Sequence, residues 1–230
     1  DPDRLAAARR AVAEHGCDVL VLDDGFQHRR LNRDLDVVLI DATCPYGFGH
    51  LLPRGLLREP HGSLRRASLV VLTRSDQVSA ARGAELRVQL SRWAGHDQIV
   101  EVAFRATGLV NTIGTTAPLQ SLAESRVAAF CGIGNPEAFW SGLDPVATRA
   151  FPDHHVYSDD DLAELADWAD GHEADMLLTT RKDLVKIPRT HLGTIPLWAI
   201  EIEVDFVSGR QALEAAVAAA TLDDQGLSGS

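Results

Sequence analysis

Lysine and cysteine are both scarce in this 230-residue chain. Lys182 and Lys186 are the only lysines, and neither follows a glycine. Since a phosphate-binding P-loop needs a Gly-Lys-Ser/Thr run, the chain contains no Walker A motif. The cysteines are Cys17, Cys44 and Cys131, which are widely spaced, odd in number and close to apolar runs. We predict reduced thiols, and no Cys/His spacing fits a zinc site.

Long apolar runs and an excess of positive charge are also missing. No run is long enough to span a bilayer, and neither a signal peptide nor a repeat is recognised. The net charge of −11 argues against a nucleic-acid partner, because phosphate backbones bind basic faces. Basic islands at residues 28–33 and 54–66 could still hold a phosphorylated ligand. The 45% apolar content allows one large domain or two small ones.

The first half of the chain has the pattern of a doubly wound α/β sheet. Such sheets bind ligands at the carboxyl ends of their strands. The expected elements are an amphipathic helix at 3–15 ended by Gly16, buried parallel strands at 17–22, 36–42 and 68–73, a Gly/Pro/Arg-rich loop at 43–62 and a helix at 77–94.

The second half repeats this alternation of strands and helices. Residues 98–112 alternate between apolar and polar positions, which predicts extended strands that join the two halves. Ser158, with Asp161 three residues later, is the expected N-cap of a helix. The expected elements are strands at 127–132, 175–180 and 196–203, helices at 135–143, 159–170 and 209–221, and a disordered tail at 222–230.

An apolar run that ends in two acids is the strongest local signal. Residues 19–24 end in Asp23 and Asp24, which is the Walker B pattern. A carboxylate at such a strand end can hold Mg²⁺ beside nucleotide phosphates. A solvated acidic turn would give the same pattern. Gln27 and His28 follow closely, however, and a plain turn needs neither.

Other polar clusters have weaker signals. Arg58 could bind a phosphate and Glu59 a metal ion or Arg58 itself; the alternative is a surface ion pair. Asp153 could orient His154 as a base, and Lys182 could approach an anion, but ordinary loop contacts would explain all three. The glycines of residues 131–136 fall short of GxGxxG.

Five motifs in a fixed order resemble those of the tetraacyldisaccharide 4′-kinase family, the lipid A 4′-kinases. They occupy residues 23–36, 51–60, 132–136, 151–155 and 180–183. The resemblance covers nearly the whole chain. It implies transfer of the γ-phosphate of ATP, with Mg²⁺, to the 4′-hydroxyl of a tetraacyl disaccharide 1-phosphate, a lipid A precursor. It further implies peripheral attachment to the cytoplasmic face of the inner membrane.

The resemblance also implies a fold and a set of site residues. The fold is α/β, with two P-loop-kinase-like α/β/α domains whose largely parallel sheets are joined by a two-stranded linker. Residues 1–97 would be the rest of the nucleotide-binding domain, 98–112 the linker strands and 113–230 the C-terminal domain. The implied site residues are Asp23, Asp24 and Glu59 at the nucleotide and Mg²⁺ (Asp24 and Glu59 as metal ligands), Asp153 and His154 in catalysis, and Gln27, His28, Arg58, Asn135 and Lys182 at phosphate or substrate.

The chain also departs from the family pattern. The P-loop, a catalytic carboxylate and a membrane-facing helix would lie before its first helix, so we expect the chain alone to be inactive. Losing that unit would expose an apolar face, which predicts poor solubility unless a partner or dimer covers it. His50 and Arg54 replace the usual loop residues. The competing hypothesis is a non-catalytic remnant that binds a nucleotide or a partner; the missing GxGxxG disfavours a Rossmann oxidoreductase.

Overall fold

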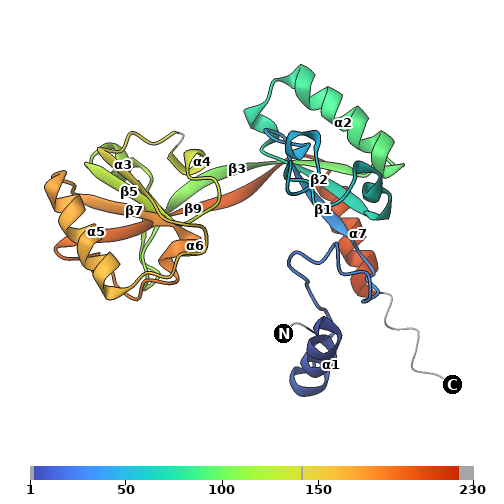
Figure 1. Cartoon of the computed structure of the whole chain (residues 1–230), viewed down its shortest axis with the longest axis horizontal. Coiled ribbons are helices and arrows are strands. Elements are labelled where there is room, and N and C mark those ends of the chain that lie inside the picture. The colour runs from blue at the N-terminus through green and yellow to red at the C-terminus, as the bar shows by residue number, and fades with distance from the viewer. Residues whose placement is uncertain (1–2, 141, 223–230) are drawn as a thin grey trace. The chain divides into compact units, whose positions relative to one another are not determined.

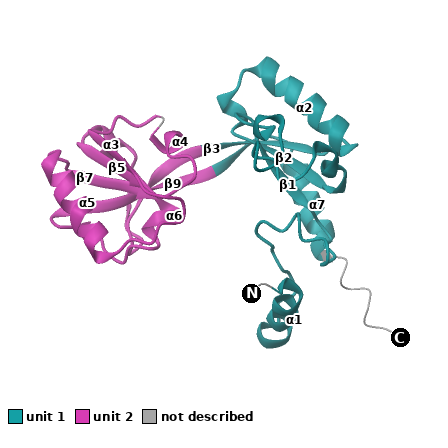
Figure 2. Cartoon of the chain, in the orientation of Figure 1, with its two compact units in different colours: residues 1–104, 204–230 teal, residues 105–203 magenta. Residues whose placement is uncertain are grey.

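The computed structural model describes residues 3–140 and 142–222, which form two compact units (Figures 1 and 2). Unit 2 is the continuous segment Arg105–Glu203, and unit 1 contains the residues on both sides of it. The chain enters unit 2 within strand β3 (Ile99–Val110) and leaves it within strand β9 (Ile195–Ser208). No helix in the described residues has the length and hydrophobicity needed to cross a membrane.

Unit 1 is built on a parallel sheet in the order β1-β2-β3. Strand β1 (Val37–Asp41) pairs in register with β2 (Leu69–Thr73), which in turn pairs with the first half of β3. Every residue of β2 is buried, as a central parallel strand requires. Both predicted strands are confirmed to within one residue at each end.

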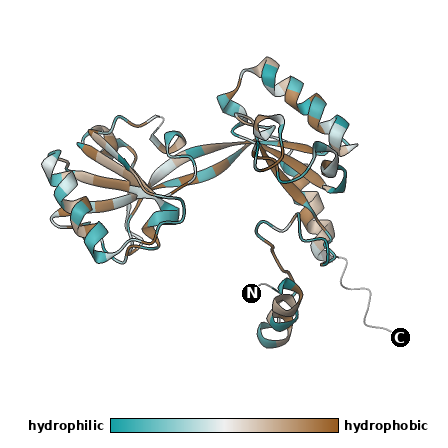
Figure 3. Ribbon diagram, in the orientation of Figure 1, coloured by the Kyte–Doolittle hydropathy of each residue, from teal (hydrophilic) through white to brown (hydrophobic). Residues whose placement is uncertain are grey.

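Helices cover both faces of this sheet. Because side chains alternate along a strand, Val70 and Leu72 face one way and Leu69 and Val71 the other. The first pair packs in a core with helix α2 (Ala80–Ala94), which Ser79 caps. The second pair packs in a core with helix α7 (Arg210–Leu222). Figure 3 shows hydrophilic and hydrophobic residues mixed along α2, as expected for a helix with one buried side.

Helix α1 (Arg4–His15) forms as predicted from its local signals. The Asp3 side chain accepts hydrogen bonds from two backbone N–H groups at its start, and Gly16 ends it at φ 62°. None of its residues is buried, although the sequence predicted an apolar face. Its caps and the helix propensity of its residues therefore stabilise this helix, since none of its side chains is buried against other described residues.

Residues 17–22 do not form the predicted buried strand. No strand of the described chain pairs with them, and Val19, Leu20 and Val21 are 51%, 40% and 93% exposed. An apolar run becomes a parallel strand only where a neighbour bonds its backbone and helices cover both faces. Neither condition is met here within the described residues, so the prediction is wrong for this structure.

The segment between β1 and β2 is a loop, as predicted, with two short 3₁₀ turns. These are η1 (Gly47–Gly49) and η2 (His61–Arg66). An isolated parallel bridge between Leu51 and Leu57 folds the loop back on itself. Gly55 fits against carbonyl oxygens of the same loop so closely that a Cβ atom there would overlap them. The loop is thereby brought back toward the sheet at Glu59.

Unit 2 is also built on parallel strands with helices on both faces. The strand order is β9-β7-β5-β6, and all three pairings are parallel. Helix α5 covers one face, and α3 and α4 lie over the other. The bounds are β4 (Thr116–Ala117), α3 (Gln120–Ala123), β5 (Val127–Cys131), α4 (Glu137–Trp140), β6 (Ala147–Ala150), α5 (Asp159–Gly171), β7 (Met176–Thr180), α6 (Arg181–Leu184) and β8 (His191–Leu192).

Most predicted elements of the second half are present, with three differences. The helix predicted at 135–143 is shorter, and its residue 141 lies outside the described chain, as does the predicted tail from 223 onward. Strand β6 was not predicted, because its four residues have no apolar run. Residues 98–112 hold the single long strand β3 instead of two linker strands, and the neighbouring long strand is β9.

The C-terminal helix also belongs elsewhere than predicted. The sequence assigned residues 113–230 to one domain, whereas α7 packs on the sheet of unit 1 through Leu213 and Ala216. The chain returns to unit 1 along β9, which a local pattern cannot reveal.

Candidate functional site

The turn that holds Asp23 and Asp24 lies directly after residues 17–22. Asp24 adopts φ 52°, a left-handed conformation that aspartate tolerates better than most residues. Its carboxylate forms an ion pair with Arg58, which is 34 positions away in the chain. Arg4 of α1 donates to the carbonyl oxygens of Asp23 and Asp24, both at 3.3 Å. Asp23 itself is exposed.

Glu59 is held by Arg66 through both carboxylate oxygens. One guanidinium nitrogen lies 3.0 Å from Oε1 and the other lies 2.9 Å from Oε2. The hydrogen bond from Arg66 lowers the pKa of Glu59, so the carboxylate is charged at neutral pH. Arg66 also stacks over the Phe26 ring, with 4.4 Å from its guanidinium carbon to the ring centre. Glu59 therefore has a fixed orientation.

Three of the predicted site residues line one cavity of unit 1. Gln27, Arg58 and Glu59 surround a space of about 170 Å³ together with apolar side chains such as Ile40 and Leu64. With Asp24 paired to Arg58, the structure brings together two acids, an arginine and an amide from two loops. His28 lies next to this group, and its backbone carbonyl accepts a hydrogen bond from Arg33 at 2.5 Å.

The carboxyl ends of β1 and β2 carry a second ion pair. Asp41 is the last residue of β1, and it pairs with Arg74, which follows β2 at φ 53°. Asp41 also accepts from the hydroxyl of Thr43 at 2.7 Å. Ligands of doubly wound sheets bind at this edge. Sequence reasoning missed Asp41 and Arg74, although an acid that ends an apolar strand was the available signal.

Unit 2 gathers Asp153, His154 and Lys182. The Lys182 ammonium lies 3.0 Å from Asp153 Oδ1, and His154 Nε2 lies 3.7 Å from Asp153 Oδ2. The hydrogen bond from Lys182 lowers the pKa of Asp153. His154 has φ 62° and a side chain that is 76% exposed, so its imidazole faces solvent in unit 2. Asn135 accepts from the N–H of Ala138 at 3.3 Å, at the start of α4.

A buried aspartate follows Lys182 in the sequence. Asp183 is fully buried and accepts hydrogen bonds from the N–H of Gly132 at 2.9 Å, the Thr180 hydroxyl at 2.8 Å and the Lys186 ammonium at 2.9 Å. Burial alone would raise its pKa, but these hydrogen bonds and the charge of Lys186 outweigh burial and lower it. Asp183 therefore ties the glycine turn after β5 to the strand end of β7.

Two neighbours of this buried carboxylate have raised pKa values. Burial raises the pKa of the Cys131 thiol to about 11, so the thiol stays protonated at neutral pH. Burial, and then the nearby charge of Asp183, raise the pKa of the Tyr157 hydroxyl. His155 lies 3.1 Å from Asp161, which also forms a capping box with the predicted N-cap Ser158. Sequence reasoning missed the structural role of Asp183 because burial is not visible in the motif.

Comparison with known proteins identifies the family. A family model described as tetraacyldisaccharide-1-P 4′-kinase, LpxK, matches residues 1–221. The chain belongs to the tetraacyldisaccharide-1-P 4′-kinase family. This confirms the resemblance that the five motifs indicated.

Relatives of this family match most of the chain. The tetraacyldisaccharide 4′-kinase of Anaeromyxobacter sp. (strain Fw109-5) is 40% identical over 226 residues, which cover 94% of this chain and 61% of the relative. That of Halothermothrix orenii (strain H 168) is 33% identical over 222 residues, which cover 88% and 58%. The chain thus spans about three fifths of the length of these relatives.

A solved structure of the same family shares the fold. It is the "apo" form of LpxK from Aquifex aeolicus in complex with ATP, with a TM-score of 0.68 and 27% identity. The match covers 95% of this chain and 62% of that one. The mixed α/β class with a mostly parallel sheet is therefore confirmed.

Proposed function

We propose that this chain is the part of a tetraacyldisaccharide 4′-kinase that carries the Walker B acids and the second domain. The reaction would transfer the γ-phosphate of ATP to the 4′-hydroxyl of a tetraacyl disaccharide 1-phosphate. The convergence of Asp24, Arg58, Glu59 and Gln27 in unit 1 of a chain of this family carries the proposal. Phosphoryl transfer depends mainly on positioning and on neutralising charge, and these side chains suit both tasks.

The acids of unit 1 fit the chemistry of Mg²⁺. The described residues hold no cluster of three or more His, Cys, Asp or Glu side chains that could bind a metal. Mg²⁺, however, usually binds one or two carboxylates together with substrate phosphates and water. Asp24 and Glu59 would supply such oxygens, with the exposed Asp23 beside them. When bound, the ion would neutralise charge on the β- and γ-phosphates.

The ion pair of Arg58 with Asp24 suggests that Arg58 binds a phosphate. Its side chain is 56% exposed, and its guanidinium group is held beside the turn by Asp24. Guanidinium groups bind phosphate oxygens through two parallel hydrogen bonds. We assign Arg58 to a phosphate of ATP, with Gln27 and His28 as neighbouring polar contacts. Pairing with Asp24 keeps the arginine in place before the nucleotide arrives.

Asp153, His154 and Lys182 of unit 2 would act on the lipid that accepts the phosphate. Asp153 is kept ionised by Lys182, so it can orient the imidazole of His154. We assign these two residues to catalysis, and Lys182 and Asn135 to substrate or phosphate contacts. Because the proposed acceptor carries four acyl chains, we also propose that the protein works at the cytoplasmic face of the inner membrane.

A chimaeric enzyme tests the proposal. The chain would replace the segment that it matches in the Anaeromyxobacter relative, 61% of that protein, and the chimaera would be assayed with Mg-ATP and tetraacyl disaccharide 1-phosphate. We expect the 4′-phosphorylated product from the chimaera and none from the chain alone, which has no Walker A motif. Asp24→Asn or Glu59→Gln in the chimaera should lower kcat at least about 100-fold, a typical loss for a transition-state electrostatic contact.

The matched control is Asp97→Asn, which removes an exposed carboxylate elsewhere in unit 1 and should leave kcat unchanged. A folded chimaera that binds an ATP analogue but forms no product would contradict the proposal. That result would favour a non-catalytic remnant that binds nucleotide or a partner.

A further inference from the structure

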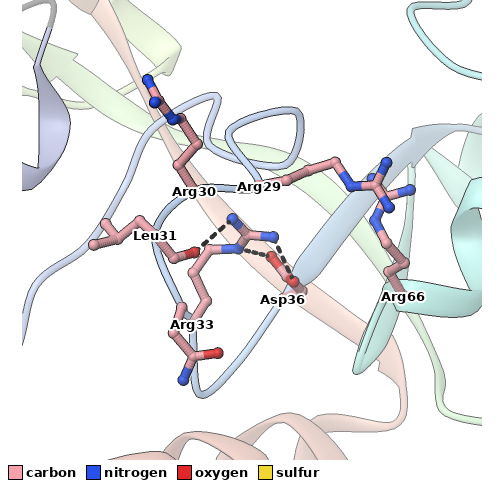
Figure 4. A pocket seen from close by; sticks show the side chains of 7 residues that line it. Arg29, Arg30, Leu31, Arg33, Asp36 and Arg66 are labelled. Atoms are coloured by element: carbon pink, nitrogen blue, oxygen red, sulfur yellow. Dashed lines mark hydrogen bonds and ion pairs between the residues drawn. The ribbon is translucent and has the colours of Figure 1, made fainter.

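A second cavity in unit 1 is lined mainly by arginines. Its volume is about 350 Å³, and Arg29, Arg30, Arg33 and Arg66 line it together with Asp36 (Figure 4). We propose that this arginine cavity binds a dianionic phosphate group. The site differs from the one built by Asp24 and Arg58, and none of the roles assigned above uses Arg29 or Arg30.

The balance of charge in the cavity is positive. Two of the four guanidinium groups are matched by carboxylates, Arg33 by Asp36 and Arg66 by Glu59. Arg29 interacts electrostatically with the same Glu59, and Arg30 has no hydrogen bond or ion pair with any described residue. Two positive charges therefore remain on a chain whose net charge is −11.

The loop that carries the two unmatched arginines is fixed at its far end. Arg33 donates to Asp36 at 2.6 and 3.1 Å and to the carbonyl of His28 at 2.5 Å. Asp36 in turn accepts, through its carbonyl, the N–H of Ser68 at 2.8 Å, at the start of β2. Both side chains of the Arg33–Asp36 pair are largely buried. The backbone of Arg29 and Arg30 is therefore anchored to the sheet, which reduces the entropy lost on binding.

The geometry favours an anion between two chain segments. In Figure 4, Arg29 points toward Arg66, which belongs to η2, while Arg30 points away from both. Two guanidinium groups that approach each other repel unless negative charge lies between them. Glu59 supplies one such charge, and a bound phosphate would supply the rest. Arg66 is itself held in place by Glu59 and Phe26, so it presents a fixed surface.

The chemistry of the ligand follows from this charge. A phosphate monoester carries about −1.5 to −2 charges at pH 7, which matches the excess of two positive charges around the cavity. Guanidinium forks bind phosphate oxygens in pairs, and arginine is preferred where such recognition matters. The cavity lies at the amino-terminal end of β1, because Asp36 directly precedes that strand. The ion pair of Arg66 with Glu59 links the cavity to the proposed nucleotide site.

Two sources carry a dianionic phosphate, namely a sugar 1-phosphate headgroup and free phosphate. The test is calorimetric titration of the purified chain in phosphate-free buffer with glucose 1-phosphate and with inorganic phosphate. We expect saturable binding that weakens with added salt. The double variant Arg29→Gln/Arg30→Gln should weaken binding at least about tenfold, since hydrogen bonds to charged groups contribute this much. No ATP is present, so failure of this proposal is distinct from failure of the kinase proposal.

The chain offers a matched control for the loss of two charges. Arg9→Gln/Arg10→Gln removes an adjacent, exposed arginine pair from α1 and should change the affinity less than about twofold. Tighter binding of glucose 1-phosphate than of inorganic phosphate would assign the site to a sugar phosphate; equal affinities would assign it to free phosphate, and both results support the proposal. Absence of saturable binding, or equal loss in the two double variants, would overturn it. Phosphatidylglycerol vesicles are a third ligand in the test. If Arg29→Gln/Arg30→Gln weakens binding to these vesicles but to neither phosphate, the proposal is overturned in favour of a membrane surface.

Discussion

Removal of the buried carboxylate of Asp183 should destabilise the chain strongly. Asp183→Asn keeps the shape of the side chain but removes its charge. With the amide oxygen toward Gly132 and Thr180, the amide nitrogen must face the ammonium of Lys186, and two donors then oppose each other. The opposite orientation would lose the bonds to Gly132 and Thr180 instead. The substitution therefore cannot keep all three contacts.

The size of the loss in unfolding free energy follows from the burial of Asp183. Breaking a buried ion pair by removing one partner typically destabilises by about 3–5 kcal/mol. The Lys186 side chain is 23% exposed and also donates to the carbonyl of His155 at 3.0 Å, so part of its charge stays solvated. We therefore expect a loss near the lower end, about 3 kcal/mol. Lys186→Met should also destabilise, and the double variant should lose less than the sum of the two.

The assay is urea denaturation of the whole chain, followed by tryptophan fluorescence. Trp168 packs against the core of unit 2 and reports on it. The folded pKa of Asp183 lies below its unfolded value, so its stabilisation is complete above about pH 4 and is lost as the pH falls through the folded pKa. The difference between wild type and Asp183→Asn should thus be constant from pH 5 to 8, on the order of 3 kcal/mol, and shrink in stronger acid.

An exposed aspartate of the same unit serves as the control. Asp144→Asn should change the free energy of unfolding by less than about 0.5 kcal/mol. If Asp183→Asn destabilises by less than about 1 kcal/mol at pH 7, a level common for ordinary substitutions, the buried ion pair is not what stabilises this part of unit 2.

Two further predictions concern a thiol and a loop glycine. Burial raises the pKa of Cys131 to about 11, so Cys131 should resist iodoacetamide at pH 8 while the exposed Cys44 reacts. Peptide mass mapping measures the labelling, and equal labelling of both cysteines in the folded chain would refute this. Gly55→Ala should force the 43–62 loop open, because the new Cβ would overlap carbonyl oxygens. Amide hydrogen exchange in the loop should become at least about tenfold faster, and unchanged exchange would show that the loop tolerates a side chain.

Elements with complete local signals could be predicted from the sequence. Ser158 and Asp161 give both halves of a capping box, and the helix that they start was placed correctly. The apolar run of β2 is also unambiguous, because all its neighbours lie within the chain. Residues 17–22 are similarly rich in valine and leucine but pair with no strand of the described residues, and Val21 is consequently exposed. A strand depends on its partners, which a local pattern does not contain.

The candidate site was only partly predictable. The motifs selected Asp24, Arg58 and Glu59, and the structure brings them to adjoining loops, but whether they bind nucleotide and metal stays a prediction. Sequence could not show that Arg66 holds Glu59, because nothing in the pattern distinguishes Arg66 from the arginine before it. The burial of Asp183 was hidden for the same reason, since the sequence around it is polar.

The interruption of unit 1 by unit 2 sets the order in which the chain can complete its parts during synthesis. All residues of unit 2 emerge from the ribosome before α7, whose side chains cover Leu69 and Val71. Since domains generally fold as units as the chain emerges, unit 2 can finish first, while one face of the earlier sheet stays bare until the last helix is made. Translation that stops near residue 203 would leave that face open, and such a product is a natural substrate for chaperones or proteases.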